Sequence, residues 1–180
     1  MKLNKLKYFM EHEGCRNVGR FAIIKATKNF FIGSSSRKVV LRYRLACYFS
    51  SRAKFLTTYI LKKLQRTYGV YISSKADIGA GLILPHPNGV VIGEKVIIGK
   101  NCTIYQQVTL GGGKVGDQSS GNYPVIGDNV TIYAGAKVLG SIKIGDNVII
   151  GANAVIIKDV PSKAVAVGVP GKNILREDNQ

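Results

Sequence analysis

The 180-residue chain has few of the residues that most often bind metals or cross-link a small fold. It contains two histidines, His12 and His86, so a zinc site built from three histidines is excluded and we expect no metal. Its three cysteines are an odd number, and Cys102 falls on an apolar position of a repeat. A disulfide framework is therefore not expected, and a reducing, cytoplasmic environment is the default.

Long apolar runs are also absent. No stretch of about 18 apolar residues occurs, because Lys25 and Lys28 interrupt the best candidate, so a membrane-spanning helix is not expected. No clean apolar segment follows the basic start of the chain, and a secretory signal is therefore not predicted either.

Acidic residues are scarce at one end of the chain. Residues 1–70 hold sixteen Lys and Arg against two acids, a net charge of +14, whereas residues 71–180 hold ten against eight, a net charge of +2. Such a bias indicates an anionic partner, for example lipid headgroups, nucleic acid or a phosphorylated ligand. We do not expect nucleic acid, because no recognition motif accompanies the charge.

Residues 1–69 are predicted to form a basic, largely helical segment. Apolar residues from Leu3 to Met10 alternate with lysines, and Ser34 to Ser36 can cap a second helix that runs through Phe49. Two interpretations stay open. The segment attaches peripherally to the inner face of an anionic membrane, or it covers an open end of the domain that follows.

What the chain has in abundance is a six-residue repeat, in which an aliphatic residue recurs and glycine often follows it. The repeat positions are Ile72, Ile78, Leu84, Ile92, Ile98, Ile104, Leu110, Ile126, Ile132, Val138, Ile144, Ile150 and Ile156. A period of six indicates a hexapeptide β-helix, whereas the competing β-sandwich would show a period of two. Residues 70–174 are therefore predicted to form an all-β domain, a parallel β-helix, followed by a polar tail at 175–180.

A second set of apolar residues, often small, lies four positions after the repeat positions and is also expected to point inwards. The set is Ala76, Leu82, Val96, Cys102, Val108, Val130, Ala136, Ile142, Val148, Ala154 and Val160. Asp128-Asn129 and Asp146-Asn147 suit the tight corners between strands, where left-handed backbone conformations are needed.

The repeat slips twice, and loops on a rigid scaffold often carry function. The first slip inserts two residues around His86, which lies between Pro85 and Pro87. An imidazole that titrates near neutrality suits a general base that takes a proton from a hydroxyl. The second slip is a loop at 111–125. It opens with three glycines and Lys114, where a ligand can approach backbone N–H donors.

Together these features resemble the left-handed β-helix acyltransferases, and within them the serine O-acetyltransferase branch. Besides the repeat, the resemblance rests on three runs: LPHPNGVVIGE at 84–94, VTLGG at 108–112 and VAVGVPGK at 165–172. It covers about residues 70–174. It implies a left-handed coil, a homotrimer, and acetyl-CoA bound as the acyl donor in clefts between neighbouring subunits.

The resemblance also implies roles for single residues. His86 matches the catalytic histidine, which deprotonates an acceptor hydroxyl for direct attack on the thioester. The candidates for binding acetyl-CoA are Gly111, Gly112, Gly113, Lys114, Ala134, Ala152, Lys158 and Lys172. Gly112 would lie beside the pantetheine arm, the two alanines along it, and Lys158 and Lys172 near the CoA phosphates. The candidates for binding the acceptor or orienting His86 are Tyr71, Asn88, Glu94 and Tyr123.

The chain departs from serine acetyltransferases where those enzymes hold their substrate. Pro85 and Tyr71 stand at two aspartate positions, Asn122-Tyr123 stands at an Arg-His pair, and no aspartate precedes Asp77. A zwitterion needs charged or strongly polar partners, whereas a neutral sugar hydroxyl does not.

We therefore expect O-acetylation of a sugar. The basic segment also resembles that of short family members associated with surface polysaccharide synthesis, which implies a surface polysaccharide or its lipid-linked precursor as the acceptor. The alternative is serine O-acetylation in cysteine biosynthesis, and N-acetylation of an amino sugar stays open. A γ-carbonic anhydrase is strongly disfavoured by the histidine count. A non-enzymatic scaffold, or another base, would be indicated if His86 proved dispensable.

Overall fold

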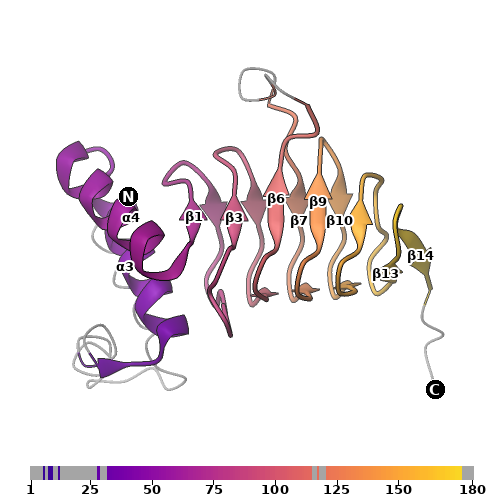
Figure 1. Cartoon of the computed structure of the whole chain (residues 1–180). Helices are drawn as coiled ribbons and strands as arrows, with labels where there is room; N and C mark the ends of the chain where they lie inside the picture. Colours follow the sequence, from indigo (N-terminus) through magenta and orange to yellow (C-terminus); the bar gives the residue numbers. More distant parts are fainter. Residues whose placement is uncertain are drawn as a thin grey trace.

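The computed structural model describes residues 6, 8, 9, 12, 28, 32–114, 117 and 121–175. In this part of the chain, two helices lie at one end of a rod of stacked short strands (Figure 1). Helix α3 spans Ser35–Phe49 and helix α4 spans Lys54–Tyr68. The helix predicted to run through Phe49 corresponds to α3. Ser34 is its N-cap residue, but the Ser34 side chain makes no capping hydrogen bond.

Two other parts of the prediction have different outcomes. The helical piece expected from Leu3 to Met10 lies largely outside the described residues. Helix α4 was expected only as a continuation of the basic segment, yet Thr57, Ile60 and Leu64 are buried at helical spacing. Its end at Gly69, with φ of 63°, is a left-handed glycine cap. In the described residues, neither helix is long and apolar enough to cross a membrane.

The strands are short and form three sheets. Their bounds are β1 Tyr71–Ile72, β2 Asp77–Ile78, β3 Val91–Ile92, β4 Ile97–Ile98, β5 Thr103–Ile104, β6 Thr109–Gly111, β7 Val125–Ile126, β8 Thr131–Ile132, β9 Lys137–Leu139, β10 Lys143–Ile144, β11 Ile149–Ile150, β12 Val155–Ile156, β13 Val165–Val167 and β14 Lys172–Ile174. The first sheet has the order β1-β3-β6-β9-β12, the second β2-β4-β7-β10, and the third β5-β8-β11-β13-β14. The last pair, β13 with β14, is antiparallel.

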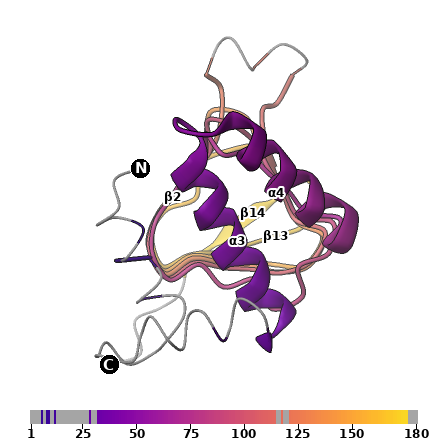
Figure 2. The same ribbon diagram turned by 90° about the vertical axis from the view of Figure 1, so that its left-hand side faces the viewer.

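The chain visits the first, second and third sheets in turn and then returns to the first, which is a parallel β-helix. Viewed along the rod, the turns superpose, and α3 and α4 lie across the near end (Figure 2). Two of the three edges of this coil matter for the site. At the third–first edge, residues 85–90, 105–108, 133–136 and 151–154 connect the sheets. At the first–second edge, the described connecting residues are 93–96, 112–114, 117, 121–124, 140–142 and 157–159.

The repeat positions form the core, as predicted. All of them are at most 5% exposed, and Leu84, Ile104, Leu110, Ile132 and Ile150 are fully buried. The second inward set is buried as well, except for Ala76, which is half-buried. Each fully buried aliphatic side chain stabilises the fold by about 1.5–3 kcal/mol, so stacked turns supply what one turn cannot.

The corners use asparagine, as the sequence indicated. Asn129 and Asn147 have φ of 56° and 58°, in the left-handed region. The carboxylate of Asp128 accepts a hydrogen bond from the Lys100 N–H at 2.7 Å, one turn below. Asp146 accepts in the same way from the Asp128 N–H at 2.7 Å. These side chains tie neighbouring turns together where the strands are interrupted.

Helix α3 closes the first turn of the coil. Arg44 is 3% exposed, and its guanidinium donates to the carbonyls of Ile78 at 2.7 Å and Gly79 at 2.6 Å. The Tyr43 hydroxyl donates to the carbonyls of Ser73 and Ala76, both at 3.2 Å. Burial raises the pKa of Tyr43 well above its usual value, so its hydroxyl keeps its proton. The helical segment therefore covers the end of the rod, one of the two interpretations left open.

Candidate functional site

His86 lies at the third–first edge, in the first break of the repeat. It follows Ile83, which bridges to Thr103 of the third sheet, and precedes β3 of the first sheet. Its side chain is exposed, whereas Pro87 beside it is buried. The His86 carbonyl accepts a hydrogen bond from the Asn88 N–H at 2.7 Å, which closes a tight turn. The two inserted residues therefore push an imidazole outwards on a stiff loop.

A cavity of about 480 Å³ opens beside His86. Its lining residues are Ser34, Ser35, Ser36, Thr67, Tyr68, Pro85, His86, Pro87 and Asn88. The start of α3 and the end of α4 thus form one wall, and the His86 loop forms the other. Among the described residues, this lining has hydroxyl and amide groups but no carboxylate, Lys or Arg. The volume is in the range of small-molecule sites, and an acceptor hydroxyl bound here would be beside an imidazole base.

Two tyrosines extend the site along the rod, and the sequence analysis did not identify them. The Tyr105 ring is 6.5 Å from the His86 ring between centroids, at an interplanar angle of 47°. The Tyr133 ring stacks on Tyr105 at 5.1 Å and 21°. Each tyrosine occupies the first position after a third-sheet strand, β5 and β8, so the repeat itself aligns them. Their place directly after the repeat residues Ile104 and Ile132 was a signal that could have revealed them.

Two of the predicted acetyl-CoA residues share the third–first edge with His86. Ala134 follows Tyr133, and Ala152 lies one turn further along the rod. Ala134 is half-buried and Ala152 is exposed, so small side chains leave this strip of the edge open. Nearby, the Lys137 amino group donates to the carbonyls of Gln107 at 2.6 Å and Gly135 at 2.9 Å. The structure therefore brings the base and the two alanines into one column.

The glycine-rich run lies elsewhere, at the first–second edge. A Cβ added to Gly112 would be 2.7 Å from the Cβ of Asp117, so Asp117 fills the space that this glycine leaves. The Asp117 carboxylate accepts from the Lys114 N–H at 2.7 Å and from the Asn122 amide at 3.1 Å. Sequence reasoning missed Asp117, and one of the N–H donors expected to face a ligand is used by it. The roles predicted for Gly111, Gly113 and Lys114 in binding acetyl-CoA stay predictions.

Of the four residues proposed to bind the acceptor or orient His86, the structure places Asn88 in the His86 cavity. The Tyr71 hydroxyl accepts from the Gln65 amide at 2.8 Å. Glu94 pairs with Lys75 at 2.9 Å, at the first–second edge. Tyr123 is 9% exposed and packs against Gly93, also at that edge. Within one chain, Glu94 and Tyr123 are thus on a different edge from His86.

The predicted phosphate-binding lysines are both exposed. Lys158 lies at the first–second edge, the same edge as the glycine run, and Lys172 opens β14 at the far end of the rod. Their contact with CoA phosphates stays a prediction.

Other reactive groups are less suited to catalysis. Burial raises the pKa of the Cys102 thiol to about 11, and the thiol donates to the Gly127 carbonyl at 3.2 Å. A buried thiol of this kind is not a nucleophile near neutral pH. In the described ranges, no three His, Cys, Asp or Glu side chains gather to hold a metal ion.

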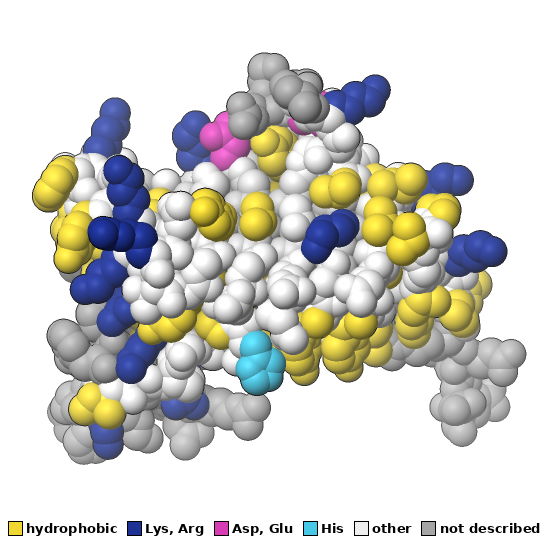
Figure 3. All heavy atoms as spheres, viewed as in Figure 1, with side chains coloured by type: hydrophobic (Ala, Val, Ile, Leu, Met, Phe, Trp, Pro, Cys, Tyr) yellow, Lys and Arg dark blue, Asp and Glu magenta, His cyan; other side chains and the backbone are white. Residues whose placement is uncertain are grey.

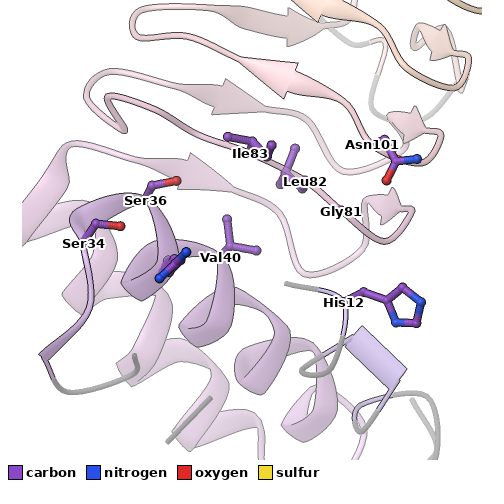
Figure 4. A pocket seen from close by; sticks show the side chains of 9 residues that line it. His12, Ser34, Ser36, Val40, Gly81, Leu82, Ile83 and Asn101 are labelled. Carbon is purple, nitrogen blue, oxygen red and sulfur yellow. The ribbon is translucent and has the colours of Figure 1, made fainter. Parts of the chain in front are cut away.

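A second cavity, of about 520 Å³, lies against α3 on the side of the other histidine. Its lining residues are His12, Ser34, Ser36, Arg37, Val40, Gly81, Leu82, Ile83 and Asn101. Figure 4 shows the N-cap residue Ser34 and Ser36 and Val40 of α3 opposite Leu82 and Ile83 of the coil. Ser34 and Ser36 line both cavities, so the start of α3 separates them.

Comparisons with known proteins agree with this architecture. The family model described as bacterial transferase hexapeptide (six repeats) matches residues 123–158. A serine acetyltransferase from Synechococcus elongatus is 52% identical over 108 residues, which are 60% of this chain and 43% of that protein. The chain spans about half the length of the curated relatives it matches.

Solved structures are similar over most of the chain. Soybean serine acetyltransferase complexed with serine matches with a TM-score of 0.78 and 31% identity, over 95% of this chain and 70% of that one. A serine acetyltransferase in complex with CoA matches with a TM-score of 0.68 and 34% identity, over 77% of this chain and 56% of that one. Repeat, coil and relatives agree, and the chain therefore belongs to the hexapeptide-repeat transferases, in the branch similar to serine acetyltransferases.

Proposed function

We propose that the protein transfers an acetyl group from acetyl-CoA to an acceptor hydroxyl, with His86 as the general base. His86 takes the hydroxyl proton while the acceptor oxygen attacks the thioester carbonyl. A C–O bond forms, the C–S bond breaks, and the proton on His86 passes to the leaving CoA thiolate. The observation that supports this most is the exposed imidazole in a cavity of about 480 Å³.

The first candidate acceptor is L-serine. The relatives are named serine acetyltransferases, and a similar structure is described as complexed with serine. They favour serine over the sugar acceptor expected from the departures in sequence. Serine would supply the hydroxyl, and its ammonium and carboxylate would need partners within the assembled site.

A neutral sugar hydroxyl is the second candidate, and one specific observation favours it. In the described residues, the His86 cavity is lined by hydroxyls, an amide and prolines, with no charged group to pair with a zwitterion. The stacked Tyr105 and Tyr133 beside it also offer an apolar surface to a sugar ring.

The proposal includes a left-handed coil and a homotrimer. The His86 column and the glycine run with Lys158 lie on two different edges of one chain. A single acetyl-CoA that contacts both needs two chains side by side, each contributing one edge. Light scattering after size-exclusion chromatography tests the assembly, since a trimer has three times the 19.5 kDa chain mass.

The function is tested by measuring release of the free CoA thiol with L-serine, nucleotide sugars and oligosaccharides as acceptors. Turnover with serine alone supports the first candidate, and turnover with sugars alone supports the second. Acetylated products are identified by mass spectrometry, which also separates O-acetylation from N-acetylation. If no hydroxyl or amine acceptor releases CoA above the hydrolysis background, the proposed function is wrong.

A further inference from the structure

One face of α4 points away from the rest of the molecule. The outer face of α4 is defined here as Phe55, Tyr59, Lys62, Lys63 and Arg66, which follow one another at helical spacing. Phe55 is 85% exposed, Tyr59 is 54% exposed, and the three cations are exposed. The opposite side of the helix packs inwards, where Leu64 is 1% exposed. Helix α4 is thus amphipathic in an unusual sense, because its outer face carries aromatic rings as well as charge.

The charge around this face has one sign. Residues 32–70 contain nine Lys and Arg and no Asp or Glu. Figure 3 shows Lys and Arg side chains gathered with apolar ones over the helical end of the molecule. No carboxylate in this range competes for the cations, so the helical end is a surface that attracts anions.

The order of residues along the outer face favours a lipid surface over the other anionic partners. The aromatic rings come first and the cations follow, and the Lys63 amino group lies 5.9 Å from the Tyr59 ring. A nucleic-acid duplex uses the cations but leaves an 85% exposed phenyl ring without an apolar partner. A single strand can stack a base on the ring, and the oligonucleotide outcome of the test below distinguishes that partner. An interface between acyl chains and headgroups accommodates both, because the ring enters the apolar layer while the cations meet phosphates.

The outer face is also next to the His86 cavity. Tyr59, Lys62, Lys63, Arg66 and Thr67 line a hollow of about 290 Å³, and Thr67 also lines the cavity that contains His86. A surface in contact with the outer face would therefore lie beside the opening through which an acceptor enters.

We propose that the outer face of α4 docks the protein on an anionic lipid bilayer. The inserted group is Phe55, with Tyr59 at the interface and Lys62, Lys63 and Arg66 on the headgroup phosphates. The proposal does not depend on the acetyl-transfer activity, because it rests only on exposure, charge and helix geometry.

The first test uses fluorescence, because the chain contains no tryptophan. The Phe55→Trp variant is mixed with vesicles of phosphatidylglycerol in phosphatidylcholine, and with phosphatidylcholine alone. We expect a blue shift with the anionic vesicles and none with the neutral ones. Raising the salt from about 0.1 M to about 1 M shortens the Debye length from about 10 Å to about 3 Å and should reverse most of the shift. Leu175→Trp, at the other end of the rod, is the matched control and should not shift.

The second test separates specific charge from total charge. Lys62→Glu with Lys63→Glu should weaken vesicle binding by about 25-fold or more, since each basic residue contributes about fivefold. Lys100→Glu with Lys143→Glu makes the same change in net charge on the β-helix and should weaken binding much less. Circular dichroism confirms that both double variants are folded.

Three outcomes would overturn the proposal. The first is no blue shift of Phe55→Trp with anionic vesicles. The second is a blue shift that appears with protein concentration alone, which would mean that a second copy covers the face. The third is a shift produced by an oligonucleotide but not by vesicles. None of these outcomes involves acetyl transfer, so a failure here is distinct from a failure of the proposed function.

Discussion

The β-helix and the helical end differ in how they bury side chains and in the charge they carry. In residues 71–175, every turn buries aliphatic side chains, and carboxylates link neighbouring corners. In residues 32–70, α4 buries only one side, α3 buries the consecutive residues Val39, Val40 and Leu41, and every charged side chain is basic. The rod supplies a rigid set of edges. The helices donate hydrogen bonds to carbonyls at its open end and form one wall of the His86 cavity. The candidate site lies where these two regions meet.

The largest expected effect on stability lies inside the rod. Ile132→Ala removes a fully buried side chain between stacked turns, where neighbours above and below resist collapse. We expect a loss of about 2–5 kcal/mol in the free energy of unfolding, measured by urea denaturation. Ile97→Ala, at a 44% exposed position of the same rod, should cost much less. Equal costs at the two positions would contradict the assignment of inward and outward faces.

The next expected effect is a pH dependence of stability that comes from the thiol buried inside the rod. Burial raises the pKa of the Cys102 thiol from 9.0 to about 11, so folding favours the protonated form. This contribution is complete below about pH 9 and is lost as the pH rises towards about 11, for a total of about 2–3 kcal/mol. The free energy of unfolding of the wild type should therefore fall relative to that of Cys102→Val between pH 8.5 and pH 11, as followed by urea denaturation. A difference that stays constant across this range would contradict the burial of the thiol.

The junction between the two regions is tested by Arg44→Met. The change leaves two carbonyls of the first turn, at Ile78 and Gly79, without their donor. We expect a loss of about 1–3 kcal/mol, because buried acceptors lose their hydrogen bonds. Arg66→Met, at an exposed position of α4, should change the free energy of unfolding by less than about 0.5 kcal/mol. If both variants behave alike in thermal denaturation, α3 does not act as a cap.

The smallest effect concerns the ring beside His86. Tyr105→Ala removes the packing of the His86 ring and should lower kcat by about tenfold, less than a full 1 Å misplacement can cost. Tyr105→Phe keeps the ring and should restore most of the activity, while KM for acetyl-CoA changes little in both variants. Steady-state kinetics with a matched pH profile provide the measurement. A Phe variant as slow as the Ala variant would assign the role to the hydroxyl rather than to the ring.

The core of the rod could be predicted from the sequence because each inward position is marked by the six-residue repeat. One aliphatic residue per six positions identifies the inward face of each strand, and Asn129 and Asn147 mark corners by their backbone preference. His86 could be identified because it interrupts this regular pattern.

The remaining features depend on contacts that a period cannot reveal. Asp117 fills the space above Gly112 inside an irregular loop, and Tyr105 lies beside His86 from the next turn of the coil. Glu94 is close to His86 in sequence but lies on another edge, paired with Lys75. Which side chains lie close together depends on the path of the chain around the three sheets. That path is set by the stacking of the turns and cannot be read from the period of the sequence.

In the proposed reaction, one outward-facing imidazole, held where the coil breaks its repeat, removes the proton from the acceptor. The most direct test of this step compares CoA release by the wild type and by His86→Ala, with the acceptor that gives the highest turnover. We expect a fall in kcat of about 10²–10⁴ with an unchanged melting temperature, because the side chain is exposed. Full activity in the folded variant would contradict this role of His86.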